Sequence, residues 1–168
     1  MPIIVSICAY SFASAIIFIY VGQEGEYATA GYGAASRFEQ ILFLPVLGIN
    51  TAIISIIAQN YGAMNFDRIR LTFFTAIKYA LSIMFFAAIL VFVLADVVTS
   101  MFSNNPEVID YGKRYLRISA IVLPAYPLFF ISNGFFMSLK KSENAMISNV
   151  FRNLLIPILV FYMAKYYS

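Results

Sequence analysis

The side chains best able to do chemistry in this sequence are isolated polar and ionisable groups inside long apolar stretches. Glu39 is the acid that lies deepest in such a stretch, about two helical turns into the apolar run of residues 31–60. A carboxylate in that position could carry a proton or a cation, because ionisable groups inside a membrane often mark ion pathways. The competing interpretation is an acid at the membrane interface that is solvated or paired with Arg37.

A polar stripe lies further along the same apolar run. Asn50, Thr51 and Ser55 follow closely after Pro45 and Gly48. A bend at the proline would loosen the backbone there, and polar groups beside it could line a cavity, so the three residues are candidates for substrate binding. Buried asparagines also form hydrogen bonds between membrane helices, and the sequence leaves both roles open.

A second set of candidates for substrate binding lies within residues 115–139. Tyr126, Phe129 and Asn133 recur at near-helical spacing on that segment. Aromatic faces attract organic cations, so this surface could hold a cationic substrate. The alternative is that these aromatic residues face lipid or the interior of the helix bundle.

The composition indicates the solvent in which these groups must lie. Of the 168 residues, 62% are hydrophobic and only 11% are charged, and the mean hydropathy is +0.84. A soluble domain typically has about 25% charged residues. With so few charges the chain cannot cover a water-exposed surface, and we therefore predict an integral membrane protein.

Several classes of function are excluded or disfavoured by the residue types. The chain contains no histidine, and Cys8 is its only cysteine. An internal disulfide and the usual His/Cys metal sites are therefore excluded. A membrane-embedded enzyme would need clustered catalytic groups, and no acid lies in the middle of any apolar segment. The net charge of +3 is too small to indicate nucleic-acid binding.

We expect residues 1–168 to form one all-α domain, a bundle of five transmembrane helices. Crossing the hydrocarbon core takes about 20 helical residues. The predicted spans cover about residues 2–21, 31–60, 71–95, 115–139 and 144–164. Residues 22–30 are expected to form a short acidic loop and residues 96–114 a polar connection. The uncharged start suggests that the chain begins inside a larger protein.

The motif at the end of the second span carries a family resemblance. Pro45 and Gly48 are followed by the string Ala58-Gln59-Asn60-Tyr61-Gly62-Ala63 and then by Arg68. This order resembles the signature of the multidrug and toxic compound extrusion (MATE) family, with Ala58 where a glycine is usual. Three further stretches match family motifs in the expected order: Phe102–Val108, Tyr115–Ile118 with Pro124, and Asn149 with Arg152 and Pro157.

The resemblance implies a secondary active antiporter of the plasma membrane. Such transporters export drugs or organic cations in exchange for Na+ or H+, and no other cofactor is implied. The chain fits helices seven to eleven, most of the second of two six-helix lobes. Its partners would be the lipid bilayer, small amphipathic or cationic substrates and the missing first lobe, and not nucleic acid.

The resemblance bears on the coupling site in a less direct way. Several family members carry an acid in the seventh helix and another in the tenth. The corresponding stretches here, residues 2–21 and 120–137, contain neither Asp nor Glu. That absence points to the first lobe for ion coupling and leaves Glu39 as the candidate in this lobe.

Six residues are expected to shape or move the helices. They are Pro45, Gly48, Gln59, Asn60, Gly62 and Arg152. The proline and glycine would bend their helix, and the Gln-Asn-x-Gly turn would cap and end it. The arginine matches the family motif and could have a structural or gating role. Snorkelling of its side chain towards the lipid headgroups is the alternative.

Two alternatives to the antiporter stay open at this point. One is a lipid-linked oligosaccharide flippase of the same superfold, which would need a large basic cavity for a pyrophosphate. Away from the ends of the predicted spans the basic residues are few, chiefly Lys78 and Arg152, and this argues against the flippase. The other alternative is a truncated membrane fragment without a function of its own.

Overall fold

The computed structural model describes residues 2–140, 143, 145 and 147–153, and in this part of the chain the secondary structure is helical. The elements are α1 (Pro2–Gln23), α2 (Glu26–Gly62), α3 (Phe66–Ser100), α4 (Pro106–Val122), the 3-10 turn η1 (Leu123–Ala125) and α5 (Tyr126–Ser138). Residues 147–153 form a further helical stretch. The predicted all-α class is confirmed.

Three helical segments are long and apolar enough to cross a membrane: α2, α3 and the run from α4 to α5 over Pro106–Ser138. The predicted first span coincides with α1, whose apolar part over Cys8–Gln23 is shorter. Most of the predicted fifth span, residues 144–164, lies outside the described residues. The lengths and hydropathy agree with an integral membrane protein.

The predicted loop at residues 22–30 is wrong. Helix α1 continues to Gln23 and α2 begins at Glu26, so that Glu24 and Gly25 alone separate the two helices. Gly25 has φ of 107°, a backbone conformation that residues with a side chain rarely adopt. The polar composition of this stretch was misleading because acidic residues are stabilising in the first turn of a helix, where Glu26 lies.

The predicted connection at residues 96–114 is also much shorter than expected. Helix α3 runs to Ser100, and α4 begins at Pro106. Asn105 caps α4, since its Oδ1 accepts a hydrogen bond of 2.9 Å from the backbone N–H of Glu107. Proline suits the first helical position because its missing N–H would have no partner there. Local start signals therefore determine this boundary.

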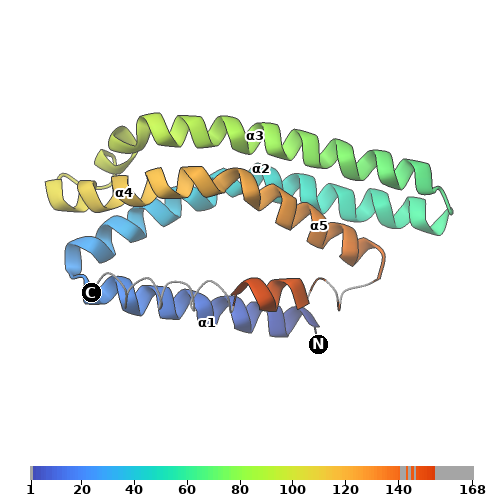
Figure 1. The fold of residues 1–168 in the computed structure, drawn as a ribbon, viewed down its shortest axis with the longest axis horizontal. Coiled ribbons are helices and arrows are strands. Elements are labelled where there is room, and N and C mark those ends of the chain that lie inside the picture. The colour runs from blue at the N-terminus through green and yellow to red at the C-terminus, as the bar shows by residue number, and fades with distance from the viewer. Residues whose placement is uncertain (1, 141–142, 144, 146, 154–168) are drawn as a thin grey trace.

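Helix α2 lies at the centre of the arrangement and contacts α1, α3, α4 and α5. Figure 1 shows it rising from the end of α1 and then running alongside α3. It remains one helix through Pro45, whose ring is exposed, although the sequence suggested a bend or a break there. The predicted bend of the fourth segment is confirmed, because η1 interrupts the helix between α4 and α5.

Alanines form a large part of the core, and many large apolar side chains point outward. Helix α3 buries a stripe of alanines at helical spacing: Ala76, Ala80, Ala87, Ala88 and Ala95. Phe85, Phe86 and Val93 on the same helix are more than 60% exposed. Small residues allow membrane helices to approach closely, while lipid solvates the large apolar ones. This distribution is typical of a helix bundle in a bilayer.

The end of α2 is set by a residue that the sequence did not single out. Met64 has φ of 56°, in the left-handed region. Its N–H donates to the carbonyl of Tyr61, and the N–H of Asn65 donates to the carbonyl of Asn60. This pair of bonds is the Schellman arrangement, in which glycine usually occupies the left-handed position. Gly62 was expected at the end of the helix and is its last helical residue, whereas the left-handed position falls at Met64.

Replacing Met64 by glycine should stabilise the protein. The left-handed conformation costs a residue with a Cβ about 1–2 kcal/mol, and glycine avoids most of that cost. We expect Met64→Gly to raise the free energy of unfolding by about 1 kcal/mol, measured as a higher midpoint of thermal unfolding in detergent. Met64→Ala is the control because it keeps the Cβ. An equal gain in stability from both substitutions would contradict the assignment of a left-handed conformation to Met64.

Candidate functional site

Glu39 lies inside the helix bundle and is only 8% exposed. Its Oε2 accepts a hydrogen bond of 2.7 Å from the hydroxyl of Tyr115, and its Oε1 accepts one of 2.5 Å from the hydroxyl of Ser119. Both partners belong to α4, so the carboxylate of α2 is held by the neighbouring helix. Among the described residues no ion pair includes Glu39, and Arg37 is exposed. The structure therefore does not show the predicted pairing with Arg37.

The position of Glu39 depends on a close approach between α2 and α4. A Cβ on Gly31 would lie 2.7 Å from the carbonyl oxygen of Val108 and 2.9 Å from the backbone nitrogen of Gly112. The two backbones are thus nearly in contact two turns before Glu39. Small residues permit such contacts between membrane helices. This contact brings Tyr115 and Ser119, one and two turns further along α4, to the carboxylate.

A second tyrosine, Tyr32, lies next to the group formed by Glu39, Tyr115 and Ser119. The ring of Tyr32 meets the ring of Tyr115 edge to face, with centroids 5.1 Å apart. Tyr32 also packs against Phe18 of α1, with centroids 6.5 Å apart. Glu39 therefore has two hydroxyl donors, and one of them, Tyr115, carries its ring against that of Tyr32.

Asn50 faces α5 at its closest point to α2. A Cβ on Gly134 would collide with the side-chain amide of Asn50, so the glycine leaves room for that amide between the two helices. Asn50 Oδ1 is the one buried side-chain N or O atom without a hydrogen-bond partner among the described residues. The structure thus places Asn50 between the helices, and its amide oxygen can still accept a hydrogen bond.

The other two polar residues of the predicted stripe lie elsewhere. Thr51 is exposed, and its hydroxyl donates to the carbonyl of Leu47 one turn earlier. Ser55 is exposed and accepts a 3.4 Å hydrogen bond from Gln59. Asn60 donates to the carbonyl of Ile56. In the described part of the chain these groups bond within α2 and do not share a site with Asn50.

The predicted aromatic surface on α5 is part of a cluster that includes α2. The Tyr126 ring packs against Phe43, with centroids 4.8 Å apart, and stacks with Phe130 at 6.4 Å. Phe129 lies 6.0 Å from Phe130. Phe43, two residues before Pro45, was not predicted as a site residue. An isolated phenylalanine in an apolar run gives no signal of this role.

Arg152 and Asn133 come together with Phe129 at the other end of this cluster. The guanidinium carbon of Arg152 lies 4.0 Å from the centroid of the Phe129 ring. Asn133 is buried, and its Oδ1 accepts a 3.4 Å hydrogen bond from Asn149. The structure therefore brings Arg152 together with two residues of the predicted substrate-binding set, Phe129 and Asn133. Pro157 lies outside the described residues.

Two residues that hold Glu39 were missed by the sequence analysis as site residues. Tyr115 and Ser119 are four positions apart on α4, which places them on one helical face. This spacing could have indicated a polar face, but it could not indicate which helix would supply the partner. The pairing of Glu39 with a segment 76 and 80 positions away is a property of the tertiary fold.

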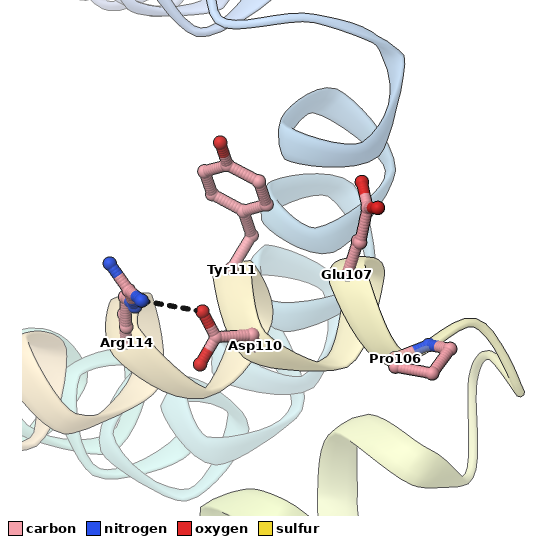
Figure 2. Close-up of a pocket in the computed structure, with 5 residues that line it drawn as sticks. All are labelled: Pro106, Glu107, Asp110, Tyr111 and Arg114. Atoms are coloured by element: carbon pink, nitrogen blue, oxygen red, sulfur yellow. Dashed lines mark ion pairs between the residues drawn. The ribbon is translucent and has the colours of Figure 1, made fainter.

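A shallow surface depression of about 360 Å3 lies at the start of α4 and contains none of the predicted site residues. Figure 2 shows its lining: Pro106, Glu107, Asp110, Tyr111 and Arg114. Arg114 and Asp110 form an ion pair of 2.7 Å along the helix. Both side chains are more than half exposed, so this pair contributes little to stability.

Comparison with known proteins identifies relatives along nearly the whole chain. The family model described as MatE matches residues 2–163. The chain is 26% identical over 135 residues to the probable multidrug resistance protein YpnP of Bacillus subtilis, covering 80% of this chain and 29% of that protein. It is 26% identical over 106 residues to the FAD transporter of Shewanella oneidensis, covering 63% and 24%. The chain thus spans less than a third of the length of either relative.

Two solved structures share the fold. A MOP superfamily transporter from Pyrococcus furiosus superposes with a TM-score of 0.85 at 23% identity, covering 91% of this chain and 35% of that one. A MATE crystallised in complex with MaL6 gives a TM-score of 0.80 at 23% identity, covering 92% and 35%. At this level of identity the similarity shows a common helical architecture.

Proposed function

Since the chain belongs to the MatE family, we propose that it forms most of one lobe of a secondary transporter that exports small molecules in exchange for Na+ or H+. Members of the family are transporters and not enzymes. The protein is a multi-pass membrane protein, and the plasma membrane is the compartment in which export would act. The relatives are named for multidrug resistance and, in one case, for FAD transport, which supports small molecules as substrates.

The observation that carries the proposal is the buried carboxylate of Glu39. An ion-coupled transporter needs a group inside the membrane whose occupancy by a cation changes the balance between two conformations. Glu39 is buried, and among the described residues it has hydroxyl partners and no cationic one. Such a carboxylate is a candidate group for binding a proton or a small cation inside the membrane.

The contacts of Glu39 suggest how neutralisation would act on the helices. The charged carboxylate accepts hydrogen bonds from Tyr115 and Ser119 and so ties α2 to α4. Hydrogen bonds to a charged group are stronger than those to a neutral one. Uptake of a proton would therefore weaken this tie, whereas Na+ would recruit the same hydroxyl oxygens as ligands. Either event would change the relative stability of two packings of these helices.

The proposal includes a second lobe, which the chain does not contain. In transporters built from parallel repeats the substrate cavity lies at the interface of the two halves. The faces of α2 and α5 that carry Asn50 and Tyr126 would line this lobe's side of the cavity. The flippase alternative is weaker, because the basic residues that gather on α4, Lys113, Arg114 and Arg117, are paired with Asp96 and Asp110.

The test is expression of the complete gene that contains this chain in a host lacking its own efflux pumps. We expect dye efflux that depends on an imposed Na+ or pH gradient, and the gradient that drives it identifies the coupling ion. Empty vector provides the background rate. Absence of efflux under both gradients, with the protein present in the membrane, would refute the proposed antiport.

A further inference from the structure

Arg152 lies in the predicted fifth span and has no countercharge in the described part of the chain. Its Nε and Nη2 donate to Asn153 Oδ1 at 3.4 and 3.2 Å, and the ion pairs of the described residues involve other side chains. Asn153 is 4% exposed, while Arg152 is half-buried. A charge inside a membrane protein is costly unless it has a partner. A partner for this guanidinium would therefore lower the cost of its charge.

The hydrogen bonds to Asn153 use two of the N–H donors of the guanidinium. Arginine carries five N–H groups in a planar fork. The planar fork as a whole matches the two oxygens of a carboxylate or phosphate.

The apolar surroundings of Arg152 are aromatic. The guanidinium stacks on Phe129 at 4.0 Å, and the cluster continues through Phe130 and Tyr126 to Phe43. Stacking against a ring holds the planar fork in one orientation and reduces the entropy lost when a ligand binds. A ligand anchored at the fork could rest an aromatic or apolar body on the same cluster.

The helical stretch that bears Arg152 is attached to α5 by an amide contact. Asn149 donates to Asn133 Oδ1 at 3.4 Å, and Asn133 in turn donates to the carbonyl of Phe129 at 3.0 Å. These bonds fix the stretch over the ring on which the guanidinium lies. Arg152 is therefore held by packing and hydrogen bonds on both sides, as a binding group should be.

We infer that Arg152 anchors an anionic group, a carboxylate or a phosphate, on an amphipathic substrate whose body lies against the Phe129–Tyr126 cluster. This inference rests on the proposed transport function. It changes the expected substrate class from organic cations to molecules that carry an anion. An inside-negative membrane potential favours the outward movement of such a molecule.

The experiment compares pairs of dyes that differ in one anionic group. One pair is a rhodamine with a free carboxylate and the same rhodamine as its ethyl ester. The other is 4-methylumbelliferyl phosphate and 4-methylumbelliferone. Binding to the purified complete transporter is measured by fluorescence polarisation. We expect the wild type to prefer the anionic member of at least one pair, and the preferred pair distinguishes carboxylate from phosphate.

Arg152→Gln should weaken binding of the preferred anionic dye by about 10- to 100-fold, the range of a charge-assisted hydrogen-bonded anchor, and leave the matched neutral or esterified dye unchanged. Arg70→Gln is the control, because Arg70 also lies over a phenylalanine, Phe74 at 5.9 Å, but is exposed. If Arg152→Gln fails to fold, as judged by thermal unfolding, Arg152→Lys removes the fork and the stacking while it retains the charge.

Three results would overturn the inference. Equal weakening of both members of a pair would indicate a structural role for Arg152. Equal affinities of the wild type and Arg152→Gln for the anionic dye would show that Arg152 does not take part in the anion site. A preference that disappears when phosphatidylglycerol is added would assign the guanidinium to a lipid headgroup. Selective binding without gradient-driven efflux would instead refute the antiport and leave the anion site in place.

Discussion

Glu39→Gln is expected to abolish most of the ion-driven efflux of the complete transporter. The amide has nearly the same shape as the carboxylate, but it cannot take up a proton and is a poor ligand for Na+. We expect the gradient-dependent part of dye efflux to fall by about 5- to 150-fold, the range of a coupling free energy of about 1–3 kcal/mol. The measurement is efflux from preloaded cells with and without the driving gradient.

The matched control for this prediction is Glu26→Gln. Glu26 lies on the same helix as Glu39 but is exposed in its first turn. It has no role in the proposed coupling, so its substitution should leave efflux unchanged. Equal efflux from wild type and Glu39→Gln, at equal amounts of protein in the membrane, would place the coupling site outside this lobe.

Gly31→Ala is expected to have the largest effect on stability. Its Cβ would meet the backbone of α4 at 2.7 and 2.9 Å, and a backbone cannot move aside as a flexible side chain can. Overpacking of this kind costs about 1–3 kcal/mol and occasionally more. The separation of α2 and α4 that relieves it would also move Tyr115 and Ser119 away from Glu39, so efflux should fall together with the midpoint of thermal unfolding.

Gly33→Ala provides the comparison, two positions along the same helix. No atom lies within 4 Å of a Cβ at Gly33. Alanine favours a helix over glycine by about 1 kcal/mol, so this variant should be as stable as the wild type or slightly more stable. Similar behaviour of the two variants would mean that α2 and α4 are not in close contact at Gly31.

The sequence predicted Glu39 as the acid of interest, but it could not predict the environment of that acid. Hydropathy and helical length place the residue inside a span. Whether it is solvated, paired or hydrogen-bonded depends on the helix beside it. Here a glycine contact brings Tyr115 and Ser119 to it. Interactions between residues about 80 positions apart are not encoded in any local pattern.

The helix boundaries show a second limit of prediction from the sequence. Acidic and amide residues near residues 22–30 and 96–114 suggested loops, but most of these residues are helical. Polar composition reports solvent exposure more than backbone conformation. In a membrane protein a helix can extend beyond the bilayer into water, as α2 with 37 residues and α3 with 35 would do. Capping residues such as Asn105 were the better guide.

The end of α2 shows that a residue type can suggest the right motif at the wrong position. Gly62 was expected to end the helix, and the helix does end there. The left-handed residue is nevertheless Met64, two positions later. The preference for glycine in that conformation is only about 1–2 kcal/mol, so a residue with a Cβ can still occupy it.

Arg152 shows the same limit of prediction. Its motif was recognised in the sequence, but its contacts with Phe129 and Asn153 could be seen only in the folded chain.

The most direct test of the proposed coupling is the release of cations when substrate binds to the purified complete transporter. Antiport requires that substrate and coupling ion favour different conformations, so binding of one should expel the other. The measurement uses a pH indicator in weakly buffered detergent solution and, separately, a Na+-sensitive dye. Addition of a transported dye should release H+ or Na+ from the wild type and neither from Glu39→Gln. Equal release from both proteins would contradict the role of Glu39 as the coupling carboxylate.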